Sequence, residues 1–306
     1  MFSADFDYYR AGSVAEAGQL LAAHPGAKLL AGGHSLIPLL KLRLAAPGAV
    51  IDIGRIAELR GISASGDSLR IGALTTHAEI AASAEVRQHA AALAEAAGQI
   101  GDPAVRNRGT IGGNVAHADP ASDLPTVLSA LGATLEVTGP EGERSVAVGD
   151  FFQGVMMTSL GERDLLTAIQ VPIGGDRGTA YVKYSHPASR YAVIGVAASI
   201  TLAGRGWLSA LTGQGKGDPT CGEAAVAIGG LVPAPARCGA VEAALAGQPL
   251  KAETFAAAAE AVGGDLGGDL LGDVFASAEY RKAVAPVYVR RALAAAAERA
   301  TAGQAG

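Results

Sequence analysis

Residues 100–125, IGDPAVRNRGTIGGNVAHADPASDLP, carry the strongest indication of how this chain folds. The segment is dense in Gly, Asn, Asp and Pro, a composition that predicts a long ordered loop instead of a regular element. Long loops inside compact domains are usually functional, so the segment is itself a candidate site. A second glycine-rich loop, AGGHS at residues 31–35, directly follows a strand predicted at 28–31.

Both loops have the composition that brings backbone close to a ligand. Glycine permits that approach, and successive N–H groups can then converge on an anion such as a diphosphate. Neither loop is a G-x-G-x-x-G or a phosphate-loop motif, which disfavours a Rossmann site and a nucleotide hydrolase. A tight turn is the alternative explanation for either loop alone. Together they predict a diphosphate held by Ala31, Gly32, Gly33, His34 and Ser35 and by Thr110, Ile111, Gly112, Gly113 and Asn114.

Length, composition and charge exclude several classes of protein. The 306 residues suffice for two modest domains, and although 49% are hydrophobic, no run approaches the roughly 20 apolar residues of a membrane span. The net charge is −5, and Lys and Arg are scattered, so we expect no nucleic-acid partner. The N-terminal segment MFSADFDYYRAGS lacks the cationic stretch and apolar core of a signal peptide, which predicts a cytoplasmic protein.

The cysteine count limits the chemistry of the chain. Only Cys221 and Cys238 are present, whereas an iron–sulfur cluster normally takes four thiolates. We therefore expect no metal ligands and two free thiols in a reducing compartment. Metal chemistry, if the protein takes part in any, is expected on another chain.

Periodicity and turn residues predict an α+β fold. Ser13 with Glu16 and Thr76 with Glu79 have the spacing of capping boxes at helix starts. A composition shift at residues 172–178 predicts a linker, after which strands followed by Ala-rich helices indicate an antiparallel sheet. The expected helices are 13–24, 90–100, 121–131, 239–246, 252–262 and 287–300; the expected strands are 28–31, 50–53, 69–73, 133–138, 144–148, 165–171, 180–184, 192–202, 207–212 and 223–229.

Individual polar residues leave more than one interpretation open. Asp123 can accept from a ribose hydroxyl or cap the helix that starts there. Lys183, on a predicted strand, can neutralise a phosphate or a reduced flavin, or face solvent. Arg106 and Arg108 can steer an electron acceptor or anchor a neighbouring chain. No Ser/His/Asp or Cys/His arrangement is present, so we predict no catalytic residue in this chain.

Four segments together resemble the FAD-binding medium subunit of the molybdenum hydroxylases, the family of aerobic carbon monoxide dehydrogenase and xanthine dehydrogenase. The resemblance extends from Phe6 to about Ala300. It implies a FAD-binding domain of the p-cresol methylhydroxylase type, built of two α+β subdomains, over residues 1–175. A C-terminal α+β domain over 176–300 and a tail at 301–306 are expected to follow. The matching segments are residues 29–45, 100–125, 181–198 and 280–293.

The resemblance also implies which residues surround the cofactor. Both glycine loops are expected to contact the FAD diphosphate. Asp123 matches an aspartate near the adenosine or ribitol hydroxyls, and Lys183 matches the lysine of the corresponding strand. Leu166 resembles a leucine that packs on the flavin ring, and Ile100 stands where an apolar or aromatic residue lies close to it. Tyr191 matches a tyrosine that can cover the isoalloxazine.

The resemblance implies an oxidoreductase subunit that works by electron transfer. A flavin accepts electrons singly and passes them on in pairs, so we expect electrons to arrive from 2Fe-2S clusters and leave through FAD to an external acceptor. A large molybdenum-cofactor subunit and a small 2Fe-2S subunit are the expected partners, in a dimer of heterotrimers. The alternative is a stand-alone flavin-dependent oxidase of the same fold.

Substrate and acceptor are not indicated by the sequence. The segment YSHPASRYA at 184–192 differs from the Gly-Asp-Tyr form associated with carbon monoxide dehydrogenase. The substrate of the complex therefore stays open among carbon monoxide, purines, other heterocycles and aldehydes. For the glycine loops, we expect Gly33→Val or Gly112→Val to abolish FAD binding by blocking the approach of the diphosphate to the backbone.

Overall fold

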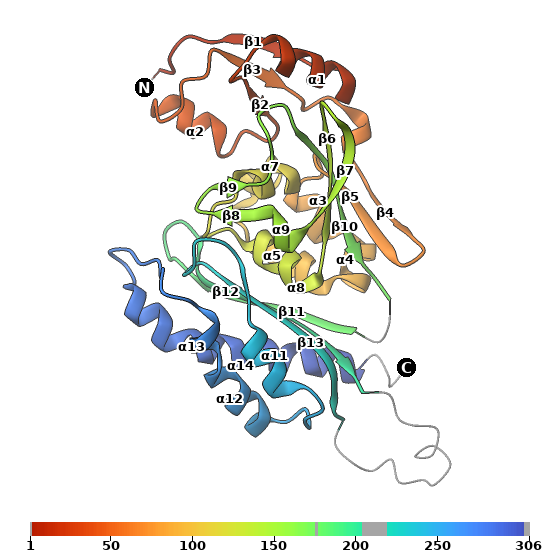
Figure 1. Ribbon diagram of the computed structural model, residues 1–306, viewed down its shortest axis with the longest axis vertical. Helices are drawn as coiled ribbons and strands as arrows, with labels where there is room; N and C mark the ends of the chain where they lie inside the picture. The colour runs from red at the N-terminus through yellow and green to blue at the C-terminus, as the bar shows by residue number, and fades with distance from the viewer. Residues whose placement is uncertain (1, 175–176, 204–218, 303–306) are drawn as a thin grey trace. The chain divides into compact units, whose positions relative to one another are not determined.

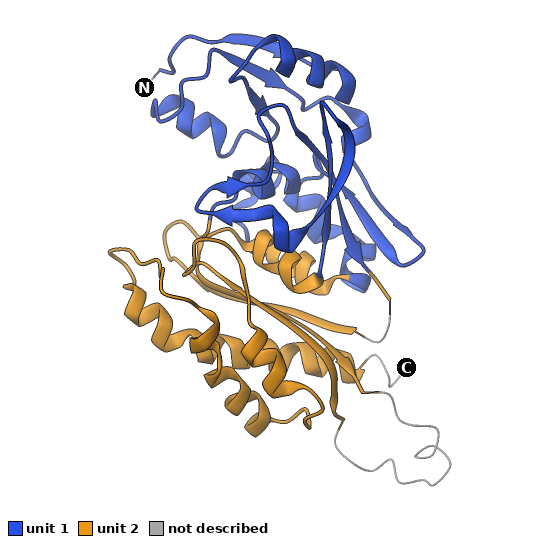
Figure 2. Ribbon diagram, viewed as in Figure 1, with its two compact units in different colours: residues 1–89, 97–119, 132–172 blue, residues 90–96, 120–131, 173–306 orange. Residues whose placement is uncertain are grey.

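The computed structural model describes residues 2–174, 177–203 and 219–302, and they form two compact units (Figures 1 and 2). Unit 1 comprises residues 1–89, 97–119 and 132–172, and unit 2 comprises residues 90–96, 120–131 and 173–306. Two short segments from the first half of the sequence therefore belong to the second unit. The reason is packing, because the helix within 120–131 lies against strands of the later sheet.

Unit 1 begins with a small parallel sheet in the order β1-β3-β2. Helix α1 (Val14–Ala23) packs beside it, and Ser13 caps this helix by accepting from the Glu16 N–H. The expected capping box is only half formed, because the Glu16 carboxylate accepts from the Gly12 N–H instead of the Ser13 N–H. The remaining elements are β1 (Asp7–Arg10), β2 (Lys28–Leu30), α2 (Leu36–Lys41) and β3 (Ala49–Asp52).

The larger sheet of unit 1 has five antiparallel strands in the order β4-β5-β10-β6-β7. Its expected hairpin at 133–148 is confirmed, and Gly142 supplies the positive φ of the turn. The strands are β4 (Ile62–Ser65), β5 (Ser68–Gly72), β6 (Thr134–Gly139), β7 (Gly142–Ala147) and β10 (Leu165–Pro172). The elements between β7 and β10 are α9 (Val148–Phe151), β8 (Phe152–Gly154) and β9 (Met157–Thr158).

The expectation of one long loop over residues 100–125 is wrong. Two short helices interrupt it, α6 (Pro103–Arg106) and α7 (Ile111–His117), and α8 (Asp123–Leu131) begins before its end. Asp102 caps α6, which has Pro at its first position, and Thr110 caps α7 by accepting from Gly113. Gly112 of α7 allows the helix to approach Ala73 closely. Its glycines are therefore needed for packing and do not prevent a helix at 111–117.

Four further short elements complete unit 1 and the start of unit 2. Thr76 begins α3 (His77–Ala82) with the complete capping box predicted from its sequence. The 3₁₀ helix η1 (Ala57–Leu59), α4 (Ala84–His89) and α5 (Ala91–Gln99) are the others. Within the described parts of the chain, no helix combines the length and hydropathy needed to cross a membrane.

Unit 2 is built on an antiparallel sheet in the order β11-β12-β13-β14. Alternate side chains of β11 point to opposite faces, and Lys183 reaches α8 while Tyr184 stacks on Tyr288 of α14, so these helices cover opposite faces. The strands are β11 (Arg177–Ser185), β12 (Ala192–Leu202), β13 (Cys221–Gly229) and β14 (Ala236–Arg237), and the later helices are α11 (Gly239–Leu245), α12 (Ala252–Glu260), α13 (Val262–Asp265) and α14 (Ala278–Ala302).

The α+β prediction is confirmed, with local differences near the C-terminus. Helix α14 starts nine residues earlier than expected and passes through Pro286. It also includes Thr301 and Ala302, which were expected to begin the tail. The strand expected at 207–212 lies outside the described residues.

The contact between β11 and α14 generates a stability prediction. A Cβ on Gly178 would collide with the Ala296 carbonyl and the Ala300 backbone, whereas a Cβ on Gly239 would meet nothing. We expect Gly178→Ala to destabilise the chain by about 1–3 kcal/mol through overpacking, with Gly239→Ala near neutral. Urea unfolding monitored by circular dichroism measures both. Equal stability of the two variants would contradict the close packing of β11 on α14.

Candidate functional site

The second glycine loop is fixed in place by backbone hydrogen bonds. The Ile111 N–H donates to Thr75 O at 3.0 Å and the Gly112 N–H donates to Ala73 O at 2.9 Å. A Cβ on Gly112 would lie 2.5 Å from the Ala73 Cβ, so only glycine permits this approach. The first turn of α7 is therefore packed against the segment that follows β5.

The first glycine loop lies directly against the second. A Cβ on Gly32 would collide with the carbonyl oxygen of Arg108. Gly33 has φ +81°, and a Cβ there would lie 2.6 Å from the Cδ1 of Ile37. A branched side chain at Gly33 or Gly112 was expected to block the approach of a ligand. In the structure it would first collide with neighbouring atoms of the protein itself. The structure brings the two loops together, as the sequence pattern suggested.

The two loops differ in what their amides can bind. Among the described residues, none accepts a hydrogen bond from the backbone N–H of Gly32, Gly33, His34 or Ser35. By contrast, the amides of Ile111, Gly112 and Gly113 already have partners within the protein. Successive unbonded amides with one residue at positive φ form an anion-binding nest. The first loop is thus the one with donors available for a diphosphate.

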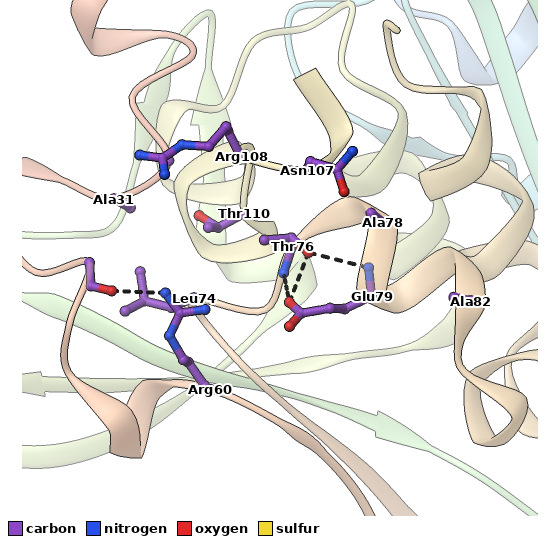
Figure 3. A pocket seen from close by; sticks show the side chains of 12 residues that line it. Ala31, Arg60, Leu74, Thr76, Ala78, Glu79, Ala82, Asn107, Arg108 and Thr110 are labelled. Atoms are coloured by element: carbon purple, nitrogen blue, oxygen red, sulfur yellow. Dashed lines mark hydrogen bonds between the residues drawn. The ribbon is translucent and has the colours of Figure 1, made fainter. Parts of the chain in front are cut away.

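A cavity of about 540 Å³ opens where the loops meet (Figure 3). Its volume lies in the range of pockets that hold small molecules and cofactors. Two cationic side chains line it, and Arg60 donates to Gly54 O at 2.8 Å. The Glu79 carboxylate accepts from the amide and hydroxyl of Thr76. The lining residues are Ala31, Gly32, Gly54, Arg60, Leu74, Thr76, Ala78, Glu79, Ala82, Asn107, Arg108 and Thr110.

Ile100 and Leu166 both lie in unit 1, and each is held by a local feature that the sequence did not indicate. The Arg106 guanidinium donates to the carbonyls of Ile100 and Gly101 at 3.0 and 3.1 Å. These hydrogen bonds hold the Arg106 guanidinium against the backbone of residues 100–101. Leu166 is buried on β10 beside a register shift in the pairing with β6. Such bulges often adjoin functional sites.

Asp123, Lys183 and Tyr181 form a buried polar cluster in unit 2. Lys183 Nζ lies 2.9 Å from Asp123 Oδ2, and the Tyr181 hydroxyl donates to Asp123 Oδ1 at 2.5 Å. The Lys183 side chain is 0% exposed, so the alternative in which it faces solvent is wrong. The Asp123 carboxylate accepts from these two side chains and not from the amides of α8, so it is not a helix cap.

Tyr181 was not among the residues that the sequence patterns indicated. Its position two residues before Lys183 on one strand placed both side chains on the same face, and that spacing was the available signal. Burial raises the pKa of the Asp123 carboxyl, while Lys183 and the Tyr181 hydrogen bond oppose that rise. Burial, together with the nearby Asp123 charge, raises the pKa of Tyr181 well above its usual value, so its phenol stays a donor.

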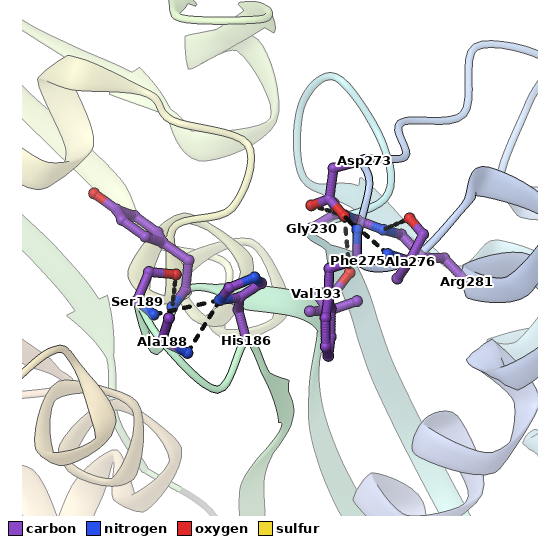
Figure 4. A network of polar contacts seen from close by, with 10 residues as sticks. His186, Ala188, Ser189, Val193, Gly230, Asp273, Phe275, Ala276 and Arg281 are labelled. Carbon is purple, nitrogen blue, oxygen red and sulfur yellow. Dashed lines mark hydrogen bonds and ion pairs between the residues drawn. The ribbon is translucent and has the colours of Figure 1, made fainter.

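Tyr191 lies in the tight turn between β11 and β12 and is 46% exposed. His186 Nδ1 accepts from the N–H groups of Ala188 and Ser189, which closes the turn (Figure 4). The His186 ring packs edge-on against Phe275 at 4.7 Å. These contacts fix the backbone that carries Tyr191.

The segment around Phe275 is fixed in turn by a buried arginine (Figure 4). Arg281 pairs with Asp273 at 2.5 Å and donates to Gly230 O at 2.7 Å. The Phe275 N–H donates to the same Asp273 carboxylate at 2.9 Å. The β11–β12 turn thus rests on an ordered segment of unit 2.

His77 is a buried histidine directly behind the second glycine loop. It is 3% exposed, and its backbone N–H donates to Gly109 O at 3.0 Å. Its ring Nδ1 has no hydrogen-bond partner among the described residues. Burial, with a smaller contribution from His34, lowers the pKa of His77 to about 4. The ring is therefore neutral at physiological pH.

The geometry of unit 1 fits FAD and gives no indication of a metal. The unbonded amides of the first loop fit a diphosphate, and the arginines Arg60 and Arg108 add positive charge at the cavity. No group of three or more His, Cys, Asp or Glu side chains suited to a metal occurs in the part of the chain that the structure describes. These features define a class of diphosphate-binding proteins whose site is built on paired glycine loops and not on a Rossmann motif.

The chain belongs to the family described as the FAD binding domain in molybdopterin dehydrogenase, which matches residues 4–174. Residues 179–296 match the CO dehydrogenase flavoprotein C-terminal domain. FAD is therefore the cofactor of this chain, and its relatives are subunits of oxidoreductases. The resemblance stated from the sequence is confirmed.

Named relatives and solved structures extend this match over nearly the whole chain. The carbon monoxide dehydrogenase medium chain of Hydrogenophaga pseudoflava is 38% identical over 95% of this chain and 96% of its own. The 6-hydroxypseudooxynicotine dehydrogenase complex subunit alpha of Paenarthrobacter nicotinovorans is 37% identical over 96% and 95%. A structure of the H. pseudoflava enzyme lacking the Mo-pyranopterin moiety superposes with a TM-score of 0.89 at 39% identity. The match covers 98% of this chain and 99% of the chain in that structure. The expected fold is thereby confirmed.

The contact between Gly112 and Ala73 predicts the effect of a substitution on cofactor binding. We expect Gly112→Val to abolish FAD binding, because α7 must move away from Ala73 and the paired loops then separate. Gly98→Ala is the control, since a Cβ there would meet only an ordinary contact with Ala81. Flavin absorbance retained after desalting measures both. Full flavin occupancy in Gly112→Val would remove α7 from the site.

His77 predicts a pH dependence of stability. Because its folded pKa of about 4 lies below the unfolded value, protonation favours the unfolded chain. The contribution of neutral His77 to the free energy of unfolding is complete above the unfolded pKa of about 6.5. It is lost as the pH falls toward the folded pKa of about 4. Between pH 7 and 4.5 we expect wild type to lose about 2 kcal/mol more than His77→Gln in urea unfolding. Parallel pH profiles would show that His77 does not titrate in this way.

Proposed function

We propose that this chain is the electron-transfer subunit of a molybdenum hydroxylase complex. It takes electrons from 2Fe-2S clusters of a partner subunit and delivers them through FAD to an external acceptor. The observation that carries the proposal is the set of unbonded amides at Gly32–Ser35 beside the second glycine loop, in a chain of this FAD-binding family. When bound, FAD supplies both one-electron and two-electron chemistry.

The residues of the chain then have distinct roles toward the cofactor. The amides of Gly32, Gly33, His34 and Ser35 bind the diphosphate, and the loop at 110–114 lies against them, with Thr110 lining the cavity. Ile100, Leu166 and Tyr191 provide apolar and aromatic surface for the flavin ring. We also assign Asp123 and Lys183, a buried ion pair, to the cofactor, as the family resemblance implies. None of these residues needs to exchange a proton with a substrate.

The domains and partners follow from the same assignment. We assign residues 1–175 to the FAD-binding domain and 176–300 to the C-terminal domain, supported by the two family matches. The described residues offer no metal cluster, and both cysteines are free and buried, so clusters and molybdenum require other chains. A large molybdenum-cofactor subunit and a small 2Fe-2S subunit, in a dimer of heterotrimers, complete the complex. Two free thiols suit a reducing compartment such as the cytoplasm.

Substrate specificity belongs to the complex and not to this chain. The names of two relatives refer to carbon monoxide and to 6-hydroxypseudooxynicotine, although both resemble this chain at nearly equal identity. A shared flavin subunit that serves different oxidations explains this observation.

Visible absorption of the chain, expressed alone and with its genomic neighbours, tests the proposal. We expect a flavin spectrum in the chain alone that candidate substrates do not bleach, and bleaching once the partner subunits are present. A colourless protein after FAD supplementation would contradict cofactor binding. Bleaching by substrate in the isolated chain would instead indicate an independent oxidase.

A further inference from the structure

Two arginines that line the cavity of unit 1 have no carboxylate partner. Within the described part of the chain, the Arg108 guanidinium makes no hydrogen bond or ion pair, and that of Arg60 donates only to Gly54 O, at 2.8 Å. Both side chains are exposed and so are accessible to a ligand. A guanidinium stays charged at physiological pH, and its planar set of N–H donors matches a phosphate group. The cavity therefore offers two cations suited to an anionic ligand.

The backbone that carries Arg60 is fixed against the segment that follows β5. The Leu74 N–H donates to Leu59 O at 2.7 Å, and a Cβ on Gly72 would lie 2.5 Å from the same carbonyl oxygen. Between these two residues, the carbonyl of Ala73 accepts from the first turn of α7. One backbone segment thus holds both Arg60 and the second glycine loop in place.

Arg108 belongs to the backbone that contacts the first glycine loop. Its carbonyl oxygen occupies the space that a Cβ on Gly32 would need, and its N–H donates to Val105 O at 3.2 Å. Arg108 and Ala31 both line the cavity (Figure 3). The Arg108 guanidinium therefore comes from a segment packed directly on the loop whose amides are unbonded, so the side chain and the amides can contribute to one anion site.

The rest of the lining suits an adenosine group better than a flavin ring. Glu79 Oε2 accepts from Thr76, whereas Glu79 Oε1 accepts no hydrogen bond from the described residues. That oxygen can accept from a ribose hydroxyl or from the amine of adenine. Among the described residues that line the cavity, none is aromatic, and Ile100 and Leu166, which are expected at the flavin ring, do not line it.

We propose that this cavity receives the adenosine diphosphate part of FAD, and that Arg60 and Arg108 make the chain select FAD over FMN, which lacks the adenylate. The inference rests on the proposed function, in which the amides of residues 32–35 bind the diphosphate. The two guanidinium groups add positive charge to these amides, and Glu79 accepts from the adenosine. Both arginines are binding residues with no part in electron transfer.

Arg60→Gln and Arg108→Gln test the proposal on the full chain after its flavin has been removed. We expect the dissociation constant for FAD to rise about tenfold in each variant, the order expected for loss of one hydrogen bond to a charged group, and the constant for FMN to change by less than about twofold. Quenching of flavin fluorescence measures both constants. Arg163→Gln is the matched control, because Arg163 is an exposed arginine of unit 1 that does not line the cavity.

Competition with ADP tests the same assignment without a flavin ring. We expect ADP to displace FAD from wild type, with an inhibition constant about tenfold higher in Arg108→Gln. Unchanged FAD affinity in both arginine variants, equal losses of affinity for FAD and FMN, or ADP bound together with FAD would each overturn the proposal. A wild-type chain that binds no FAD would instead contradict the proposed function, so the two failures are distinguishable.

Discussion

The close approach of three backbone segments is the constraint on which the site depends. Gly32 meets the carbonyl of Arg108, and Gly112 meets Ala73, so neither position has room for a side chain. The hydrogen bonds of Ile111 and Gly112 to the segment after β5 fix the second loop, which in turn supports the first. Glycine is needed at 32 and 112 because backbone segments of the same chain pack directly against these positions. The same packing leaves the amides of residues 32–35 without an acceptor among the described residues.

The two glycine loops therefore differ in the hydrogen bonds that their amides make. The amides of Ile111, Gly112 and Gly113 bond to the Thr75 and Ala73 carbonyls and to the Thr110 hydroxyl. The loop at 31–35 retains its donors. In unit 2, burial and pairing hold Asp123, Lys183 and Tyr181 together in one polar cluster.

Much of this architecture was predictable from local sequence signals. The capping box of Thr76 and Glu79 and the hairpin at 133–148 were correctly predicted, because short-range hydrogen bonding and turn chemistry determine them. The two short helices inside 100–125 were not predicted. Glycines that allow a close backbone contact in the fold cannot be told from loop glycines in the sequence alone. The pairing of Asp123 with Lys183, 60 residues apart, needed the fold of the sheet. The position of Tyr181 beside Lys183 could have been predicted, because alternate residues of a strand share one face.

The most direct test of this account is an experimental structure of the FAD-loaded chain that resolves the diphosphate. We predict diphosphate oxygens within hydrogen-bond distance of the amides of Gly32, Gly33, His34 and Ser35, with the amides of Ile111 and Gly112 still bonded to the segment after β5. A diphosphate bound away from residues 32–35, or one that displaces the backbone bonds of the second loop, would contradict it.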